Sequence, residues 1–329
     1  MPSIEADTDP GRARLLVAVG VVRRDDGRIL LAWRDARRHQ GGCWEFPGGK
    51  VHDDETVQQA LRRELDEEVG IIATCMQPLI RIPHVYPERA VLLDVYEVTA
   101  FDGEARGLEG QRIEWVDSER LPEMPLPDAN RPIVTAALLP RLCLITPDPV
   151  EQTDSAFLDA LERALAGGVK LVQLRAHRLR HDRSRLRRLA VSSLRCCLRH
   201  GAQLLLNADP ELAIELGVGL HLPAWRLRGL TEPPPRAPGT LLGASCHTAD
   251  ELARAVDIGA DFAVLGPVAE TLTHPGQPGM GFAAFQQLVA DLPLPVYAIG
   301  GMSPDQLERA VDHGAQGVAA IRALWPEGG

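Results

Sequence analysis

From residue 141 onward, short apolar segments alternate with helical segments in a regular order. Eight of the apolar segments are strand candidates: LCLIT, KLVQLR, QLLLN, GLHLP, LLGASC, FAVLG, PVYAIG and QGVAAI. Helices are expected after nearly all of them, over residues 154–166, 183–200, 209–216, 248–258, 282–291 and 304–313. Strands that alternate with helices form a parallel sheet, so eight such units predict an α/β fold, a closed (β/α)8 barrel. A doubly wound open sheet is the alternative.

The part of the chain before residue 141 has a less regular order of strands and helices, which predicts an α+β domain. LLVAVGVV and RILLAW flank a DDG turn and predict a β-hairpin. An acidic helix is expected at about residues 56–69, and another helix should begin near Asn130. The 329 residues therefore predict two domains. We expect a disordered leader at 1–14, a first domain at 15–137, a linker at 138–140 and the barrel at 141–329.

Composition excludes several classes of partner. The formal net charge is −10, which argues against duplex nucleic acid, because phosphate neutralisation requires a basic face. No apolar run reaches the roughly 18 residues that span a bilayer, and the polar N-terminus is not a secretory signal. Six cysteines without a C-x-x-C pair suit a reducing cytosol. The sequence predicts a cytoplasmic protein that acts on small molecules, and oligomerisation through the barrel stays open.

The acidic helix carries an unusual concentration of like charge. Residues three and four apart share a helix face, so Glu64, Glu67 and Glu68 project together. Like charges at this spacing cost a few tenths of a kcal/mol each. Gly70 stands where a helix C-cap is expected. A solvated helix face is the simplest interpretation, but a fixed Gly-Gly pair precedes this helix.

The full spacing is G-x5-E-x7-R-E-L-x-E-E-x-G-I, from Gly49 to Ile71, and it resembles the Nudix box at every defining position. The resemblance implies a Nudix fold, in which helices sandwich a mixed sheet, and hydrolysis of a diphosphate. It also implies Mg²⁺, for which Mn²⁺ could substitute, because hard oxygen ligands suit this cation. The implied metal ligands are Gly48 or Gly49 through a carbonyl, Glu64, Glu67, Glu68 and Glu114. Arg63 would orient the carboxylates, and Glu64 or Glu114 would be the general base.

The segments around this motif, AVGVV, RILLAWR, WEFPGGK and LPDANRPI, resemble the MutT branch of the family, which hydrolyses 8-oxo-dGTP. The resemblance implies a nucleotide substrate. It implies contacts to phosphate and sugar from Arg34, His39, Lys50 and Arg89, a base pocket lined by Phe46, and recognition of the purine edge by Asn130. An amide suits a purine edge because it offers a donor and an acceptor. Asn130 could also be a plain helix N-cap, and Phe46 could be a core residue.

The second half resembles thiamine phosphate synthase and its relative TenI, a thiazole tautomerase. The resemblance rests on LITPD, LVQLRAH, LLLNAD, GLHLP, GASCHT, LGPVAETLTHPG and YAIGGMSP. Residues that follow the barrel strands face the active end of such barrels. The implied ligand-binding residues are Gln173, Arg175, Asn207, Ser245, Thr271, Gly300 and Gly301, with His221 close by.

Two departures from the synthase pattern concern its acidic residues. The synthase has Asn-Asp after its third strand, where this chain has Asn207-Ala208, and another Asp in the segment that here reads HLPAWR. Without these carboxylates the synthase reaction loses its cation, so TenI is the better match. In that interpretation His247 transfers a proton during aromatisation of a thiazole carboxylate. The alternative is a non-catalytic module that binds a ligand or regulates the hydrolase.

The combined prediction is a Mg²⁺-dependent hydrolase of 8-oxo-dGTP fused to a TenI-like barrel. Because the barrel belongs to a thiamine-related family, the diphosphate substrate could instead be a thiamine-related compound.

Overall fold

The computed structural model describes residues 14–35, 41–86, 89–270 and 278–326. The chain divides into two compact units. The first comprises residues 1–77 and 81–131, and the second comprises residues 78–80 and 132–329. Within the described residues, no helix has the length and apolar character needed to cross a membrane. The leader expected at 1–14 lies, except for Arg14, outside the described residues.

The first unit is built around two sheets. One has the strand order β4-β1-β6-β5, with β1 antiparallel to β4 and parallel to β6. The other has the order β3-β2-β7, and both of its pairings are antiparallel. The strands are β1 (Leu15–Val22), β2 (Ile29–Arg34), β3 (Cys43–Glu45), β4 (Gly48–Lys50), β5 (Ile72–Val85), β6 (Ala90–Asp102) and β7 (Ile113–Val116). The expected α+β order is confirmed, with a mixed sheet as its main layer.

The hairpin predicted from the DDG turn is only half right. The turn is present, since Gly27 N–H donates to Arg24 O at 2.8 Å and Arg23 forms an isolated bridge with Ile29. The strands then separate into different sheets, because β1 takes β4 and β6 as neighbours whereas β2 takes β3 and β7. Strands β1 and β2 therefore pair with other strands and not with each other.

Helix α1 (Val57–Val69) packs on β1 through an apolar stripe. Leu61, Leu65 and Val69 are fully buried at the expected helical spacing. A Cβ at Gly20 of β1 would lie 3.2 Å from Leu61 Cδ1, so the helix rests closely on the strand. Gly70 ends the helix in the left-handed conformation with φ 70°, as the sequence predicts. This packing fixes the side of α1 on which the glutamates lie.

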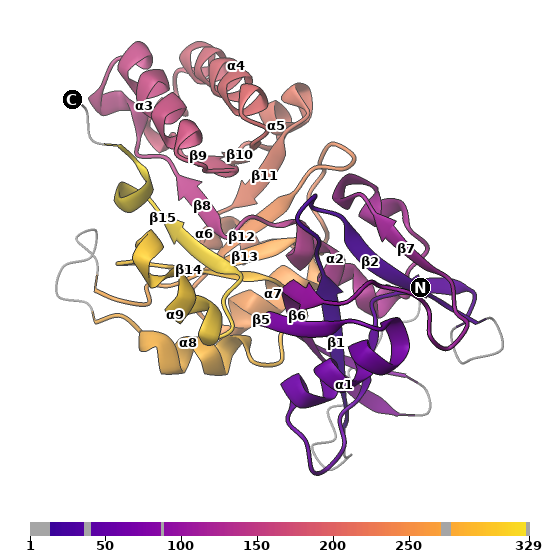
Figure 1. Ribbon diagram of the computed structural model, residues 1–329. Helices are drawn as coiled ribbons and strands as arrows, with labels where there is room; N and C mark the ends of the chain where they lie inside the picture. Colours follow the sequence, from indigo (N-terminus) through magenta and orange to yellow (C-terminus); the bar gives the residue numbers. More distant parts are fainter. Residues whose placement is uncertain (1–13, 36–40, 87–88, 271–277, 327–329) are drawn as a thin grey trace. The chain divides into compact units, whose positions relative to one another are not determined.

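The second unit contains a closed barrel of parallel strands (Figure 1). Its order is β10-β11-β12-β13-β14-β15-β8-β9. The strands are β8 (Leu142–Ile145), β9 (Leu171–Leu174), β10 (Gln203–Asn207), β11 (Gly219–Leu222), β12 (Leu242–Cys246), β13 (Phe262–Leu265), β14 (Val296–Ile299) and β15 (Gly317–Ala320). Each coincides with a predicted strand. The (β/α)8 barrel is therefore confirmed, and the open sheet is excluded.

Helices follow most barrel strands where the apolar periodicity predicts them. They are α3 (Asp154–Ala166), α4 (Arg183–Arg199), α5 (Pro210–Leu216), α6 (Ala224–Leu227), α7 (Ala249–Asp257), α8 (Gly281–Val289) and α9 (Leu307–Asp312). The main apolar cluster lies between these helices and the strands. A second cluster contains Phe262, Val264 and Tyr297, which come from neighbouring strands. Together they give the barrel a packed interior, so any ligand must bind at its ends.

The residues expected to form a linker are part of the packed barrel unit. Leu139 is buried in the same cluster as Phe262 and Tyr297, and Tyr297 Oη donates to Pro140 O at 2.5 Å. Gln316 is 1% exposed, and its Nε2 donates to Ala136 O at 3.0 Å and to Leu139 O at 3.1 Å. Helix α2 (Arg131–Leu138) is thus followed by a segment that hydrogen-bonds to two barrel residues. These are Tyr297 in β14 and Gln316, which directly precedes β15.

Replacing Gln316 with methionine is expected to destabilise the barrel by about 2 kcal/mol. Methionine keeps the volume but leaves two buried carbonyls without their donor. Hydrogen exchange of the Val318 amide, which donates to Arg141 O, measures the loss locally. Gln203→Met, at an exposed position of β10, is the matched control and should change little. A loss below about 0.5 kcal/mol at Gln316 would show that these bonds contribute nothing net.

Candidate functional site

The loop and helix that carry the acidic motif are fixed at both ends. Thr56 caps α1, because its Oγ1 accepts from Gln59 N–H while Gln59 Oε1 accepts from Thr56 N–H. The preceding strand β4 pairs with β1 through Gly48 and Gly49. The capping box therefore fixes the start of the helix, and the sheet fixes the two glycines.

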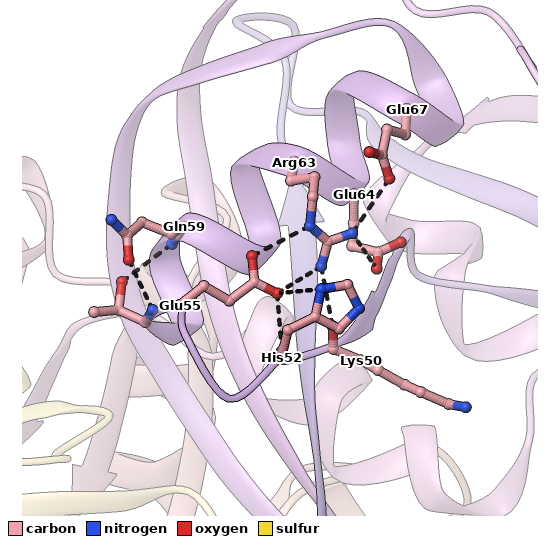
Figure 2. Close-up of polar contacts among 8 residues, drawn as sticks. Lys50, His52, Glu55, Gln59, Arg63, Glu64 and Glu67 are labelled. Atoms are coloured by element: carbon pink, nitrogen blue, oxygen red, sulfur yellow. Dashed lines mark hydrogen bonds and ion pairs between the residues drawn. The ribbon is translucent and has the colours of Figure 1, made fainter.

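Arg63 is the centre of a network of carboxylates (Figure 2). Its guanidinium donates to both oxygens of Glu55, at 2.6 and 3.2 Å. It also contacts Glu64 at 2.8 Å and Glu67 at 3.2 Å, and it donates to the Lys50 carbonyl at 3.1 Å. The hydrogen bond from Arg63 lowers the pKa of Glu55 to about 2. One planar cation thus ties the loop to the helix and orients two of the predicted metal ligands.

Two carboxylates of α1 lie against the Gly-Gly pair. Glu68 Oε2 accepts from Gly48 N–H at 3.1 Å. A Cβ at Gly49 would overlap the carboxylate of Glu64, so glycine is required for Glu64 to lie there. Gly48 has φ +148°, and a Cβ there would collide with the Ala18 carbonyl. The two glycines therefore give the carboxylates close access to the backbone.

Burial and neighbouring acids make Glu68 electrostatically unusual. Burial is the main cause that raises its pKa to about 7, and Glu45, Glu109 and Glu64 add like-charge repulsion. Oxygen donors with surplus negative charge fit a divalent cation such as Mg²⁺. The described residues contain no ready group of three or more acidic, His or Cys side chains that could hold a metal. Backbone carbonyls, water or substrate oxygens would have to complete the coordination shell.

Glu45 and Glu109 are acidic neighbours of Glu68 that the sequence analysis did not identify. Glu45 is in β3, immediately before the Phe-Pro-Gly-Gly segment, and Glu109 is in the loop before β7. The loop is attached to the end of α1, since Leu108 N–H and Gln111 Nε2 both donate to Glu68 O. By contrast, the predicted base Glu114 pairs with Arg112 at 3.1 Å. Position next to a motif was the only signal that could have identified Glu45.

A pocket of about 360 Å³ lies in the same unit, lined by Gly41, Cys43, His84, Leu126, Pro127, Asp128 and Ala129. Asn130, 9% exposed, follows directly in a 3-10 turn that continues into α2. His84 packs edge-on against Tyr86 with ring centroids 4.4 Å apart. Burial lowers the pKa of His84, and Asp128 opposes this effect. The pocket thus combines the imidazole ring of His84 and the carboxylate of Asp128 with apolar side chains, a mixture that is typical of small-molecule sites.

The other residues predicted to contact the nucleotide lie in different environments. Arg34 forms an ion pair with Glu45 at 2.7 Å, and Phe46 is 4% exposed in the core and does not line the pocket. Lys50 and Arg89 have exposed side chains. His39 lies outside the described residues. Asn130 is next in sequence to Ala129, which lines the pocket, and its contact with the base stays a prediction, as do the phosphate contacts.

In the barrel, polar side chains lie near the carboxyl ends of adjacent strands. Asn207 Nδ2 donates to Gln173 Oε1 at 2.9 Å, and His221 Nε2 lies 2.8 Å from Ser245 Oγ. Within the described part of the chain, Gln173 Nε2, Asn207 Oδ1 and His221 Nδ1 are buried without a hydrogen-bond partner. Buried polar atoms of this kind are normally satisfied, so a ligand or water is expected there.

The other predicted barrel residues that the structure describes follow the ends of barrel strands. Arg175 follows β9; burial lowers its pKa, and Asp148 opposes this effect. Gly300 and Gly301 follow β14 with φ 94° and 65°. Ala208 stands at φ 61°, a conformation that few non-glycine residues adopt. Thr271 lies outside the described residues.

His221 provides a test of the buried polar interior. Complete burial lowers its pKa from 6.5 to about 3, so the unfolded chain binds a proton more readily than the folded one. Its contribution to stability is therefore complete above pH 6.5 and is lost as the pH falls toward 3. Between pH 7 and 4.5 we expect a loss of about 2 to 3 kcal/mol, measured by hydrogen exchange of the Leu220 amide. His221→Asn should flatten this dependence, whereas His52→Gln, at an exposed position, should not.

Comparisons with known proteins agree with both halves of this description. A NUDIX domain family model matches residues 18–136, and a thiamine monophosphate synthase family model matches residues 142–324. The chain is 37% identical over 121 residues to the 8-oxo-dGTP diphosphatase of Escherichia coli, covering 94% of that protein and 37% of this chain. The chain joins a Nudix domain to a domain of the thiamine monophosphate synthase family.

The two domains have a similar sequence identity to their relatives. The second domain is 38% identical over 192 residues to the thiamine-phosphate synthase of Thermus thermophilus, covering 90% of that protein and 57% of this chain. A solved MutT structure, from work on Aliivibrio salmonicida and Vibrio cholerae, is 36% identical. The match covers 98% of the MutT chain and 38% of this chain, with a TM-score of 0.35. The first domain is a MutT-like Nudix pyrophosphohydrolase, a family that uses divalent cations.

Proposed function

We propose that the Nudix domain hydrolyses 8-oxo-dGTP to 8-oxo-dGMP and pyrophosphate. The observation that carries this proposal is the placement of Glu64 and Glu68 against Gly49 and Gly48, with Arg63 holding Glu64. It occurs in a domain that is 37% identical to an 8-oxo-dGTP diphosphatase. This arrangement can bind a diphosphate that carries a divalent cation.

Glu64, Glu68 and a carbonyl of Gly48 or Gly49 would hold Mg²⁺, or Mn²⁺ in its place, with Glu67 and Glu114 as further ligands. When bound, the cation neutralises charge on the phosphates and favours attack by water. Arg63 keeps the carboxylates oriented, and Glu64 or Glu114 accepts the proton of the attacking water. Arg34, His39, Lys50 and Arg89 would contact the phosphates and sugar.

Base selection is assigned to the pocket beside Asn130. Oxidation at the 8-position of guanine adds an N–H donor and a carbonyl acceptor. A site built to bond with these groups leaves its own polar atoms unpaired when dGTP binds, which penalises the normal base. His84 and Asp128 line the pocket and offer such polar atoms, with Asn130 next to them.

Steady-state kinetics on 8-oxo-dGTP, dGTP and hydroxymethylpyrimidine diphosphate tests the substrate assignment. We expect kcat/KM for 8-oxo-dGTP to exceed that for dGTP by at least ~10²-fold, because unpaired buried polar groups discriminate strongly. A preference for the pyrimidine diphosphate would favour a thiamine-related substrate instead. Equal rates for the two nucleotides would refute the assignment.

Asn130→Ala is expected to lower the preference for 8-oxo-dGTP over dGTP by about 10- to 100-fold. The loss of one amide removes hydrogen bonds to the base but leaves the carboxylates of α1 in place. The ratio of the two kcat/KM values measures this effect directly. Asn207→Ala, in the barrel, is the matched control. An unchanged ratio in Asn130→Ala would remove this residue from base recognition.

For the barrel we propose TenI-like aromatisation of a thiazole carboxylate, with His247 as the proton carrier. Two observations support the proposal. The side chain of His247, which follows β12, is 54% exposed. Ala208 follows β10 and Pro223 follows β11, at positions where the synthase would need acids. Gln173, Arg175, Asn207, Ser245, Thr271, Gly300 and Gly301 would bind the substrate. An aromatisation assay on wild type and His247→Ala tests the proposal, and equal rates would leave the barrel as a binding or regulatory module.

A further inference from the structure

The segment after β12 contains a histidine and a buried carboxylate four residues apart. His247 precedes Thr248, the N-cap of α7, and Glu251 is in the first turn of that helix. Glu251 is 5% exposed, although an acid in a first helical turn is ordinarily solvated. Its burial therefore needs partners that compensate for the lost water.

Both oxygens of Glu251 have such partners. Oε1 accepts from Arg228 Nε at 2.8 Å and lies 2.7 Å from Arg228 Nη2 in an ion pair. Oε2 accepts from the His247 backbone N–H at 2.6 Å and lies 3.2 Å from His247 Nδ1. Burial raises the pKa of Glu251, but the bonds from Arg228 and His247 outweigh this effect, and the net shift is downward. The carboxylate is therefore ionised and can only accept hydrogen bonds.

Ordinary helix capping does not account for these contacts. In a capping box the acid at this position bonds the backbone N–H of the N-cap residue, which here is Thr248. Thr248 Oγ1 does accept from Glu251 N–H at 3.3 Å, so half of the box is present. The carboxylate, however, binds the backbone and the ring of His247 instead. The glutamate is thus directed at the histidine.

We infer that Glu251, anchored by Arg228, is a positioning residue that holds His247 in the Nδ1–H form and leaves Nε2 as the proton acceptor. A carboxylate behind an imidazole fixes its orientation and tautomer. This inference builds on the proposed aromatisation. In that reaction a proton leaves a saturated ring carbon for Nε2, and the C–H electron pair enters the ring. The exocyclic double bond then takes up a proton from the imidazolium or from solvent, so the net change is an isomerisation.

The closing experiment reads the tautomer directly. Protein labelled with ¹⁵N-histidine gives ring nitrogen shifts by long-range proton–nitrogen NMR, and His247→Ala identifies the signals of His247. At a pH where the ring is neutral, wild type should show a protonated Nδ1 and an unprotonated Nε2. Glu251→Gln should move the ring toward the Nε2–H form, because an amide can donate as well as accept. Asp250→Asn removes a charge from the same helical turn and should change neither nitrogen.

A second variant and the aromatisation assay complete the test. If Glu251→Gln fails to fold, Arg228→Met, at a largely exposed position, loosens the carboxylate and should shift the tautomer partially. In the assay, Glu251→Gln should lower kcat about 10- to 100-fold with little change in KM. An unchanged tautomer in these variants overturns the inference. A shifted tautomer in a protein without aromatisation activity supports the inference and refutes only the proposed reaction.

Discussion

Replacing Glu68 with glutamine is expected to lower kcat/KM for 8-oxo-dGTP about 10³-fold, equal to about 4 kcal/mol of transition-state stabilisation. The amide keeps the shape of the side chain and can still accept from Gly48 N–H, but it lacks the charge that a divalent cation requires. Stability should change in the opposite direction. Glu68 is half-buried, so removing its charge avoids the cost of desolvation and relieves the repulsion from Glu45, Glu109 and Glu64 in the metal-free protein.

Three measurements separate these effects. Kinetics gives the loss of activity, calorimetric titration gives Mg²⁺ affinity, and thermal unfolding in EDTA gives the stability of the metal-free protein. Asp66→Asn is the control, because Asp66 is an exposed acid on the same helix. Full activity in Glu68→Gln would exclude this residue from metal binding. A lower Tm in EDTA would contradict the expected relief of repulsion in the metal-free protein.

Much of the fold could be predicted because local pattern and global structure agree. In the barrel, every strand pairs with strands of similar pattern, so short apolar runs such as QLLLN and GLHLP specify both the element and its neighbours. In the Nudix domain the sequence order of strands does not give their spatial order. The DDG turn predicts that β1 pairs with β2, yet β1 lies between β4 and β6. Pairing between distant segments leaves no local signal at the turn.

The candidate site likewise contains residues that are close in sequence and residues that only the fold brings together. Glu64, Glu67, Glu68 and Arg63 lie within one turn and a half of a helix, so their spacing alone shows that they are neighbours. Glu45 comes from another strand and Glu109 from a loop, and only the fold brings their charges near Glu68. In the barrel, the pairing of His247 with Glu251 follows helical spacing, but the ion pair with Arg228 spans 23 residues. No periodicity predicts such contacts.

Gly49→Ala is expected to lower kcat about 10²-fold while the domain stays folded, because an ångström-scale displacement of a catalytic group has this order of effect. Gly49 is outside the left-handed region, so its backbone can accept alanine. The added methyl group would occupy the space of the Glu64 carboxylate and push it away from the glycine pair. The loss should therefore act through Glu64 alone.

A double-mutant cycle tests that route. If Gly49→Ala acts only by displacing Glu64, then Gly49→Ala combined with Glu64→Ala should be no less active than Glu64→Ala alone. Gly20→Ala is the matched control, since its methyl group would also point at α1 but would meet the flexible end of Leu61 at 3.2 Å. It should cost only a few-fold in kcat. Additive losses in the cycle would mean that Gly49 contributes separately, as a backbone ligand or as a contact to the substrate, because the carboxylate would then be absent in both members of the comparison.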